Sequence, residues 1–365
     1  MSLRPPLRKI RSGFFSLFVL IVTAIYAGEL VWRERDTRFD DITDSAPAPT
    51  WLAFLAKLGA LFALQAVLML VVLGCGVGVQ LAQGYTRIEL SHYLIELFVL
   101  QLPGFFLIAV LALTLHTLVD NKYVGHFVVL LVFLVSSRLP DFGFEDRLYR
   151  YASRPEVVYS DLNGYGHFLP AVFWFRLYWG AFAVLLLVLA YAFWVRGRDG
   201  GLRGRLRVAV ARMTAPAWKV AGAAGAVFVA TGAWIGYNTH VVNPYVTRDA
   251  RNRLAADYER TYKPLAAAPQ PKVTASAMHV DIFPYEQRAR VAGTLTLGNT
   301  SGAPIADLYV HWPRSARVQR MAFDVPATLA AEVPAMRWHH YRLAAPMAPG
   351  AAIELTFDLE YGARG

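Results

Sequence analysis

The 365-residue sequence is poor in cysteine and in charge: it has one cysteine, Cys75, and only 17% of its residues are Asp, Glu, Lys or Arg. A single cysteine excludes an intrachain disulfide and a thiolate metal cluster. The sequence also lacks the motifs H-E-x-x-H, C-x-x-C, G-x-S-x-G and G-x-x-x-x-G-K-[ST]. We therefore expect no catalytic residue, no bound cofactor and no metal site in this chain, and we expect that it is not itself an enzyme.

Long apolar runs are what the sequence does have, since 56% of its residues are hydrophobic. About 20 apolar residues are needed to cross a bilayer as a helix. Runs near that length predict six spans, at 14–31, 52–82, 93–119, 123–137, 168–195 and 216–237. The fourth is at the short limit, so a re-entrant segment is the alternative there. The fold class predicted is a mainly α membrane protein of about six transmembrane helices, followed by an incomplete antiparallel β-sandwich or sheet domain.

The net charge of +10 is interpreted as membrane topology, because the basic residues flank apolar runs and form no soluble basic face. We expect no nucleic acid as partner. The segment 196–212 has six arginines and one acid, which places it in the cytoplasm by the positive-inside rule. Counting spans from it puts 32–51 in the cytoplasm and the C-terminal part outside. The basic segment 1–13 would then be outside, against the rule.

The most charged stretch near a span is Gly28 to Lys57, between the first two apolar runs. Its charges alternate in sign, and Pro47 and Pro49 follow them. This pattern is typical of a short amphipathic helix on a membrane surface, with an ordinary solvated loop as the alternative. The candidate site residues of this segment are Arg33, Glu34, Arg35, Asp36 and Arg38.

Other candidate features have simpler explanations. Glu96 is the best intramembrane acid, but it lies about one turn from the start of its span, which favours an interfacial role over a proton or substrate site. Gly74 and Gly78 form a small-xxx-small pair typical of helix packing. His339 and His340 are adjacent in an expected strand, so they point to opposite faces and do not share a metal.

The composition changes after Tyr237. The segment 238–272 predicts a juxtamembrane helix that ends at Pro264, followed by a linker. From Val273 to Gly365 apolar and polar residues alternate, which predicts an antiparallel sheet of about six strands with one buried face. The strand pattern ends at the last residue without a closing element, and we expect the chain to be part of a longer protein.

The motifs GELVWRERD and APAPTWLAFLAK resemble the first cytoplasmic loop of type-2 ABC exporter permeases. GYTRIEL, LVDNKYVGH, YNTHVVNPY and VDIFPYEQRARVAGTLTLGNTSGAPI further resemble a bacterial family that fuses such a permease to an aminopeptidase N-like zinc peptidase. The resemblance covers nearly the whole chain after the first dozen residues. It differs in two ways, because an upstream span and the downstream zinc motif of that family have no counterpart here.

The resemblance implies a permease-like domain at 14–237 and the start of an extracytoplasmic peptidase β-domain at 273–365. In that family the loop at 32–51 forms a coupling helix against an ATP-binding subunit, which implies this role for Arg33, Glu34, Arg35, Asp36 and Arg38. The implied partners are the lipid bilayer of the inner membrane, an ATP-binding cassette subunit, and a second permease half or a homodimer partner. ATP would lie on the separate subunit, and zinc only in the peptidase part beyond this chain.

Two functions remain open at this stage. The first is a membrane permease component of an ABC-type transport system. The second is a membrane anchor for an extracytoplasmic zinc aminopeptidase whose catalytic part lies outside this chain.

Overall fold

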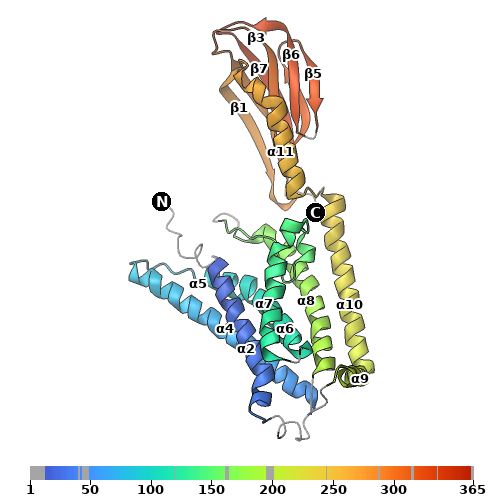
Figure 1. The fold of residues 1–365 in the computed structure, drawn as a ribbon. Coiled ribbons are helices and arrows are strands. Elements are labelled where there is room, and N and C mark those ends of the chain that lie inside the picture. Colours follow the sequence, from blue (N-terminus) through green and yellow to red (C-terminus); the bar gives the residue numbers. More distant parts are fainter. Residues whose placement is uncertain are drawn as a thin grey trace. The chain divides into compact units, whose positions relative to one another are not determined.

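The computed structural model describes residues 13–39, 42, 49–119, 121–160, 164–194, 201–243, 245–286, 288–313, 316–334 and 336–362. The chain divides into two compact units, Met1–Tyr237 and Asn238–Gly365. The first is helical and the second is mostly β-sheet (Figure 1).

Long α-helices make up most of the described part of the helical unit. Its α-helices are α2 (Gly13–Asp36), α4 (Thr50–Ala82), α5 (Leu90–Leu94), α6 (Leu102–Leu118), α7 (Lys122–Arg138), α8 (Leu169–Phe193), α9 (Leu202–Arg212) and α10 (Ala215–Gly236). Two π-helical segments, η1 (Ile95–Gln101) and η5 (Tyr237–Val242), join α5 to α6 and extend α10. Short 3₁₀ turns are η2 (Leu139–Phe142), η3 (Arg147–Tyr149) and η4 (Gly166–Phe168).

Within the described residues, five helical stretches are long and apolar enough to cross a membrane by length and composition: Thr50–Ala82, Leu90–Leu118, Lys122–Phe142, Leu169–Phe193 and Ala215–Val242. Each overlaps one of the expected spans. The short expected span at 123–137 is extended by η2 to 21 residues. The first expected span, 14–31, folds as α2 but is not among the five, so the count of six stays a prediction.

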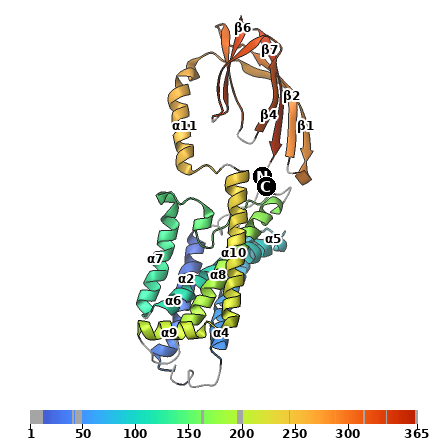
Figure 2. The same ribbon diagram turned by 90° about the vertical axis from the view of Figure 1, so that its right-hand side faces the viewer.

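Helix α6 lies at the centre of the helical unit, in contact with α2, α4, α7 and α8 (Figures 1 and 2). Its side chains are apolar on all sides, and Ala109, Val110, Ala112 and Leu113 have no exposed surface. A helix that is hydrophobic all round belongs in a core, and small residues let neighbouring backbones approach. The alanines of α6 therefore set the close packing of this unit.

A buried amide ties three of these helices together. Gln65 of α4 has no exposed surface, and its side-chain nitrogen donates to the Phe105 carbonyl at 2.9 Å and to the Thr23 hydroxyl at 3.2 Å. A polar side chain inside an apolar helical unit needs such partners, since an unsatisfied amide there is costly. Gln65 thus fixes how α2, α4 and α6 meet.

A π-helical segment, η1, precedes Pro103 in the chain. Proline has no N–H and its ring displaces the carbonyl four residues earlier, so the helical hydrogen-bond pattern must change before it. The Leu102 N–H bonds the Leu97 carbonyl, five residues back, at the end of η1. The seven residues of η1 absorb the irregularity without ending the helix.

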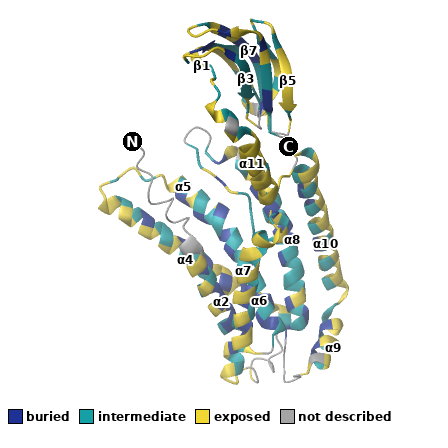
Figure 3. Cartoon of the chain, turned by 45° about the horizontal axis from the view of Figure 1, so that its top comes forward, coloured by how far each residue is buried: buried dark blue, intermediate teal, exposed yellow. Residues whose placement is uncertain are grey.

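The outward faces of the helical unit are apolar. Large exposed side chains include Leu70 and Val71 of α4, Phe127 and Leu134 of α7, and Val229 of α10. Figure 3 shows long exposed stretches along α4, α7 and α10. Apolar exposure of this extent is compatible with a membrane-embedded region.

The second unit begins with α11 (Arg248–Tyr262) and the 3₁₀ segment η6 (Lys263–Ala267). A further 3₁₀ turn, η7 (Pro284–Glu286), joins the first two strands. Its strands are β1 (Lys272–Phe283), β2 (Arg288–Gly298), β3 (Ile305–His311), β4 (Ala316–Phe323), β5 (Ala327–Val333), β6 (Trp338–Met347) and β7 (Ala352–Gly362). They form two antiparallel sheets, ordered β1-β2-β7-β4 and β3-β6-β5.

The sequence pattern predicted one strand fewer than the described residues contain. The missed strand is β5, whose central residues are all exposed and whose sequence ATLAAEV has few β-branched side chains. A strand with no buried face shows no period of two, so alternation does not reveal it.

The core of the β unit lies between the two sheets and covers only part of the larger one. Leu297 and Leu355 of the four-stranded sheet pack with Leu308 and Leu343 of the three-stranded sheet. On the same inner face, the edge strand β1 leaves apolar side chains exposed, namely Met278, Val280 and Ile282. The sandwich is therefore open at β1.

Aromatic contacts join α11 to the smaller sheet. The ring of Tyr262 lies 4.2 Å from that of Trp338, and the ring of Tyr258 lies 6.5 Å from that of His311. Tyr258 and Tyr262 are four residues apart, so they lie on one face of α11.

Gly293 lies where two backbones come close. It pairs with Met278 of β1, and a Cβ atom at this glycine would lie 3.0 Å from the Met278 Cα and against the Ala277 carbonyl. We expect Gly293→Val to push β1 from β2 and to lower the unfolding free energy of the β unit by about 1–3 kcal/mol. Faster hydrogen exchange of β1 and β2 amides in the full chain would measure this loss. Gly302→Ala is the control, because its Cβ would meet no atom within 4 Å.

Asp307 of β3 predicts a pH effect on the same unit. Its Oδ1 lies 2.7 Å from His340 Nε2 and 3.0 Å from Arg342 Nε. The hydrogen bond from His340, then that from Arg342, holds the pKa of Asp307 below its ordinary value of 3.8. A depressed carboxylate pKa stabilises the folded state above the unfolded pKa, and this contribution is lost as pH falls through the folded pKa.

We therefore expect the stability difference between the wild type and Asp307→Asn to be largest above pH 3.8 and to shrink as pH falls below it. Hydrogen exchange of β3 and β6 amides over this pH range measures the difference. A difference that stays constant with pH would contradict the assignment.

Candidate functional site

One end of the helical unit gathers the termini of several helices. The C-terminal ends of α2, α6 and α8, the N-terminal ends of α4 and α7, and the short helix α9 lie there (Figures 1 and 2). We call this the charged end, defined by Glu29, Arg33, Glu34, Arg35, Asp36, Arg38, Lys57, Lys122, Arg205 and Arg212. It contains the described residues 32–39 of the 32–51 segment that sequence reasoning singled out.

The first four predicted site residues lie at the end of the long helix α2 and not in a separate surface helix. Helix α2 runs without interruption to Asp36, so Arg33, Glu34, Arg35 and Asp36 form its last turn. Arg38 follows in a turn with a φ of 57°, a left-handed conformation uncommon for arginine. Residues 40, 41 and 43–48, where the expected helix would continue, lie outside the described part of the chain.

Glu34 pairs with a lysine from the neighbouring helix. Lys57 Nζ lies 2.8 Å from Glu34 Oε2, and the Lys57 side chain is only 10% exposed. The same ammonium lies 5.3 Å from the centre of the Trp194 ring at the end of α8. A buried cation needs a counter-charge or an aromatic face. Lys57 has both, so it joins α2, α4 and the end of α8.

Lys122 of α7 binds the remaining acids of this turn. Its Nζ lies 2.6 Å from Glu29 Oε1 and 3.0 Å from Asp36 Oδ2. Glu29 and Asp36 are seven residues apart and lie on one face of α2, two turns from each other. The bridge from Lys122 fixes α7 against α2.

The arginines give the charged end its net sign. Among the ten residues that define it, the three acids Glu29, Glu34 and Asp36 stand against five arginines and two lysines, which leaves a charge of 7 − 3 = +4. The two lysines bind these three acids. Arg35 lies over the Trp32 ring at 5.0 Å, whereas Arg33 and Arg38 are exposed.

Helix α9 closes the charged end on the other side. Arg205 is 9% exposed and donates to the Thr117 carbonyl at the end of α6 at 2.5 Å. Arg212 donates to the Trp194 carbonyl at the end of α8. Carbonyls in the last turn of a helix lack partners within it, and cations near that end are favoured by the helix dipole. These arginines were predicted only as a topology signal.

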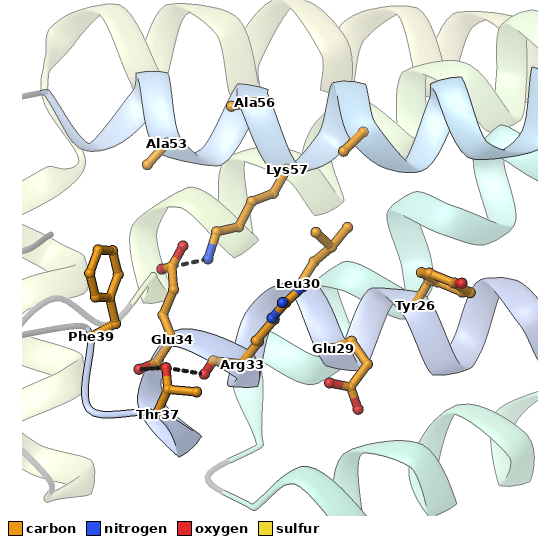
Figure 4. Close-up of a pocket in the computed structure, with 11 residues that line it drawn as sticks. Tyr26, Glu29, Leu30, Arg33, Glu34, Thr37, Phe39, Ala53, Ala56 and Lys57 are labelled. Carbon is orange, nitrogen blue, oxygen red and sulfur yellow. Dashed lines mark hydrogen bonds and ion pairs between the residues drawn. The ribbon is translucent and has the colours of Figure 1, made fainter.

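An open cleft of about 860 Å³ lies between α2 and α4 (Figure 4). Glu29, Arg33, Glu34, Thr37 and Lys57 form its polar part. Its other lining residues are Tyr26, Leu30, Phe39, Ala53, Ala56 and Ala60. In Figure 4 the Lys57–Glu34 pair spans the cleft, and the guanidinium of Arg33 lies beside Leu30.

Sequence reasoning missed a histidine pair behind this cleft. His116 of α6 has no exposed surface, and its ring lies 4.7 Å edge-on to that of His126 of α7. Gly28 and Gly125 leave room for it, because a Cβ at either would overlap the His116 ring. The two histidines are ten residues apart in the sequence, and this separation carries no local signal that their rings are in contact.

Glu96 lies in a separate cluster with the loop before α8. It accepts hydrogen bonds from Gln101 Nε2 and from the Tyr165 hydroxyl, each at 3.2 Å, and Tyr165 also lies 3.0 Å from His92 Nδ1. The structure does not bring Glu96 to the charged end. Its contacts hold the 138–167 loop against α5 and η1.

No group of three or more His, Cys, Asp or Glu side chains arranged for a metal ion occurs in the described ranges. His339 and His340 contact different acids, Glu332 and Asp307, as expected for neighbours on opposite strand faces.

No family model, curated protein or solved structure matches the chain. The resemblance to permease and peptidase fusions therefore stays a hypothesis.

The exposure of the Lys57–Glu34 pair predicts an asymmetric effect of mutation. Glu34→Gln leaves a buried ammonium without its counter-charge, whereas Lys57→Met leaves a carboxylate that is 42% exposed and can be solvated. We expect Glu34→Gln to lower stability by about 1–2 kcal/mol, after allowance for solvent screening, and Lys57→Met by less. Thermal unfolding of the full chain in detergent measures both.

The double variant Glu34→Gln/Lys57→Met is the control, since it removes both charges together. It should be more stable than Glu34→Gln alone. Equal losses in the two single variants would contradict a buried pair.

Proposed function

We propose that this chain is a membrane permease component of an ABC-type transport system. The observation that carries the proposal is the charged last turn of α2, which carries two arginines, one of them exposed, at a helix end while its acids are bound by lysines of α4 and α7. Motor coupling requires a charged element held firmly against several helices, so that force on it moves them together. The two lysine bridges supply that connection.

The arginines would contact an acidic surface of an ATP-binding subunit. The sequence pattern favoured a contact through both signs of charge, from Arg33 to Asp36. Because Glu34 and Asp36 are bound within the helical unit, the contact would instead be made mainly by Arg33, Arg35 and Arg38. Charge complementarity of this kind supports partner choice and rapid association more than raw affinity.

The proposed setting is the inner membrane, with the charged end in the cytoplasm and the β unit outside. The arginines of α9 lie at the charged end and support this orientation by the positive-inside rule. ATP would bind to the partner subunit, and a second permease half or a second copy would complete the membrane domain. The β unit would be the start of a peptidase N-terminal domain, with zinc only in the part beyond this chain.

The alternative is a membrane anchor for an extracytoplasmic zinc aminopeptidase. The open sandwich favours it, because the exposed inner face of β1 suits cover by a further domain. An anchor needs no ATP-binding partner, which separates the two functions by experiment.

Co-reconstitution of the full chain in nanodiscs with each ATP-binding subunit of its source organism tests the proposal. We expect one subunit to bind and to hydrolyse ATP faster in complex than alone. Arg35→Glu/Arg38→Glu should weaken that binding about tenfold or more, because two charges of a complementary contact are reversed. Surface plasmon resonance and phosphate release measure the two effects.

The control variant is Arg251→Glu, an exposed arginine of α11 in the other unit, which should bind as the wild type does. Binding that is unchanged by Arg35→Glu/Arg38→Glu would contradict the proposed contact. If no subunit binds, the anchor function is favoured.

A further inference from the structure

The cleft between α2 and α4 has two chemically distinct parts. Ala56 and Ala60 of α4, four residues apart on one helix face, line an apolar channel together with Leu30 and Tyr26 of α2. The polar part, with Arg33, Thr37 and the Lys57–Glu34 pair, lies toward the charged end, where Ala53 and Phe39 complete the lining (Figure 4).

The apolar part of the cleft continues onto the outward surface of the same helices. Tyr26 of α2 lines the cleft and is 50% exposed, and Ile25 next to it in the chain is 48% exposed. These faces would contact acyl chains if the helical unit lies in a bilayer. A lipid chain could therefore enter the cleft sideways without crossing a polar surface.

Arg33 decides the charge preference of the cleft. Its lining contains two acids, but Glu29 is bound by Lys122 and Glu34 by Lys57. Among the described residues, the Arg33 side chain has no ion pair or hydrogen bond of its own. An exposed guanidinium beside an apolar channel is suited to a phosphate with attached acyl chains, because it can bind two phosphate oxygens at once.

We propose that the cleft binds one anionic phospholipid, with the headgroup phosphate on Arg33 and an acyl chain along Ala56, Ala60 and Leu30. Basic pockets between membrane helices on the cytoplasmic side are known sites for acidic lipid headgroups. The site does not depend on the proposed ATPase contact, and requires only that the helical unit is membrane-embedded. Free phosphate shares the headgroup chemistry, but it would leave the apolar channel without a ligand.

Native mass spectrometry of the delipidated full chain tests this site with three probes: phosphatidylglycerol, phosphatidylcholine and inorganic phosphate. We expect one retained phosphatidylglycerol, bound about fivefold more tightly than phosphatidylcholine, as one basic contact near a membrane surface supplies. Arg33→Gln should remove the preference while keeping weak binding of both lipids. Ala56→Trp should fill the channel and lose both lipids.

Two matched controls separate this site from general lipid contact. Arg203→Gln removes an exposed arginine of α9, and Leu55→Trp adds an indole to the outward face of α4; both should bind lipid as the wild type does. Unchanged lipid preference in Arg33→Gln would overturn the proposal, even if Ala56→Trp does not fold. Displacement of phosphatidylglycerol by inorganic phosphate would also overturn it, because the acyl chain would then contribute nothing.

Discussion

A buried charge in an apolar helical unit must find a partner, and this constraint positions the helix ends of the protein. Lys57 is nearly enclosed, so Glu34 and the Trp194 ring must lie close to it. Lys122 imposes the same requirement on Glu29 and Asp36, and Arg205 does so on the end of α6. The charged end is therefore a rigid junction, in which helices that are distant in sequence are joined by a few ionic contacts.

Close packing around α6 supports that junction from within. Ala109 and Ala112 allow neighbouring helices to approach, and Gln65 joins α2, α4 and α6 through hydrogen bonds that water cannot replace in the core. A cleft opens between α2 and α4 at this end, where alanines line α4 and fill little space. A rigid junction beside an open cleft permits both a protein contact and a lipid site at neighbouring positions.

The β unit shows how far a local pattern can predict structure. Alternation identified the strands with a buried face, and the residues of β7 pack in the core as their period of two required. It did not identify β5, whose exposed residues follow no alternation. It also gave no information on the division into two sheets, because strand pairing joins residues such as Arg290 and Asp358 that are far apart in the chain.

The sequence by itself determined the long apolar helices and the strands with a buried face, since apolar run length and residue periodicity are local properties that each segment carries alone. It also identified Arg33 to Asp36 as the charged stretch of interest. Only the tertiary structure decided that these residues end a long helix, and that the acids among them are bound by lysines. Lys57 lies 23 residues from Glu34, and Lys122 lies 86 residues from Asp36. Contacts at such separations depend on how helices pack, which no local pattern encodes.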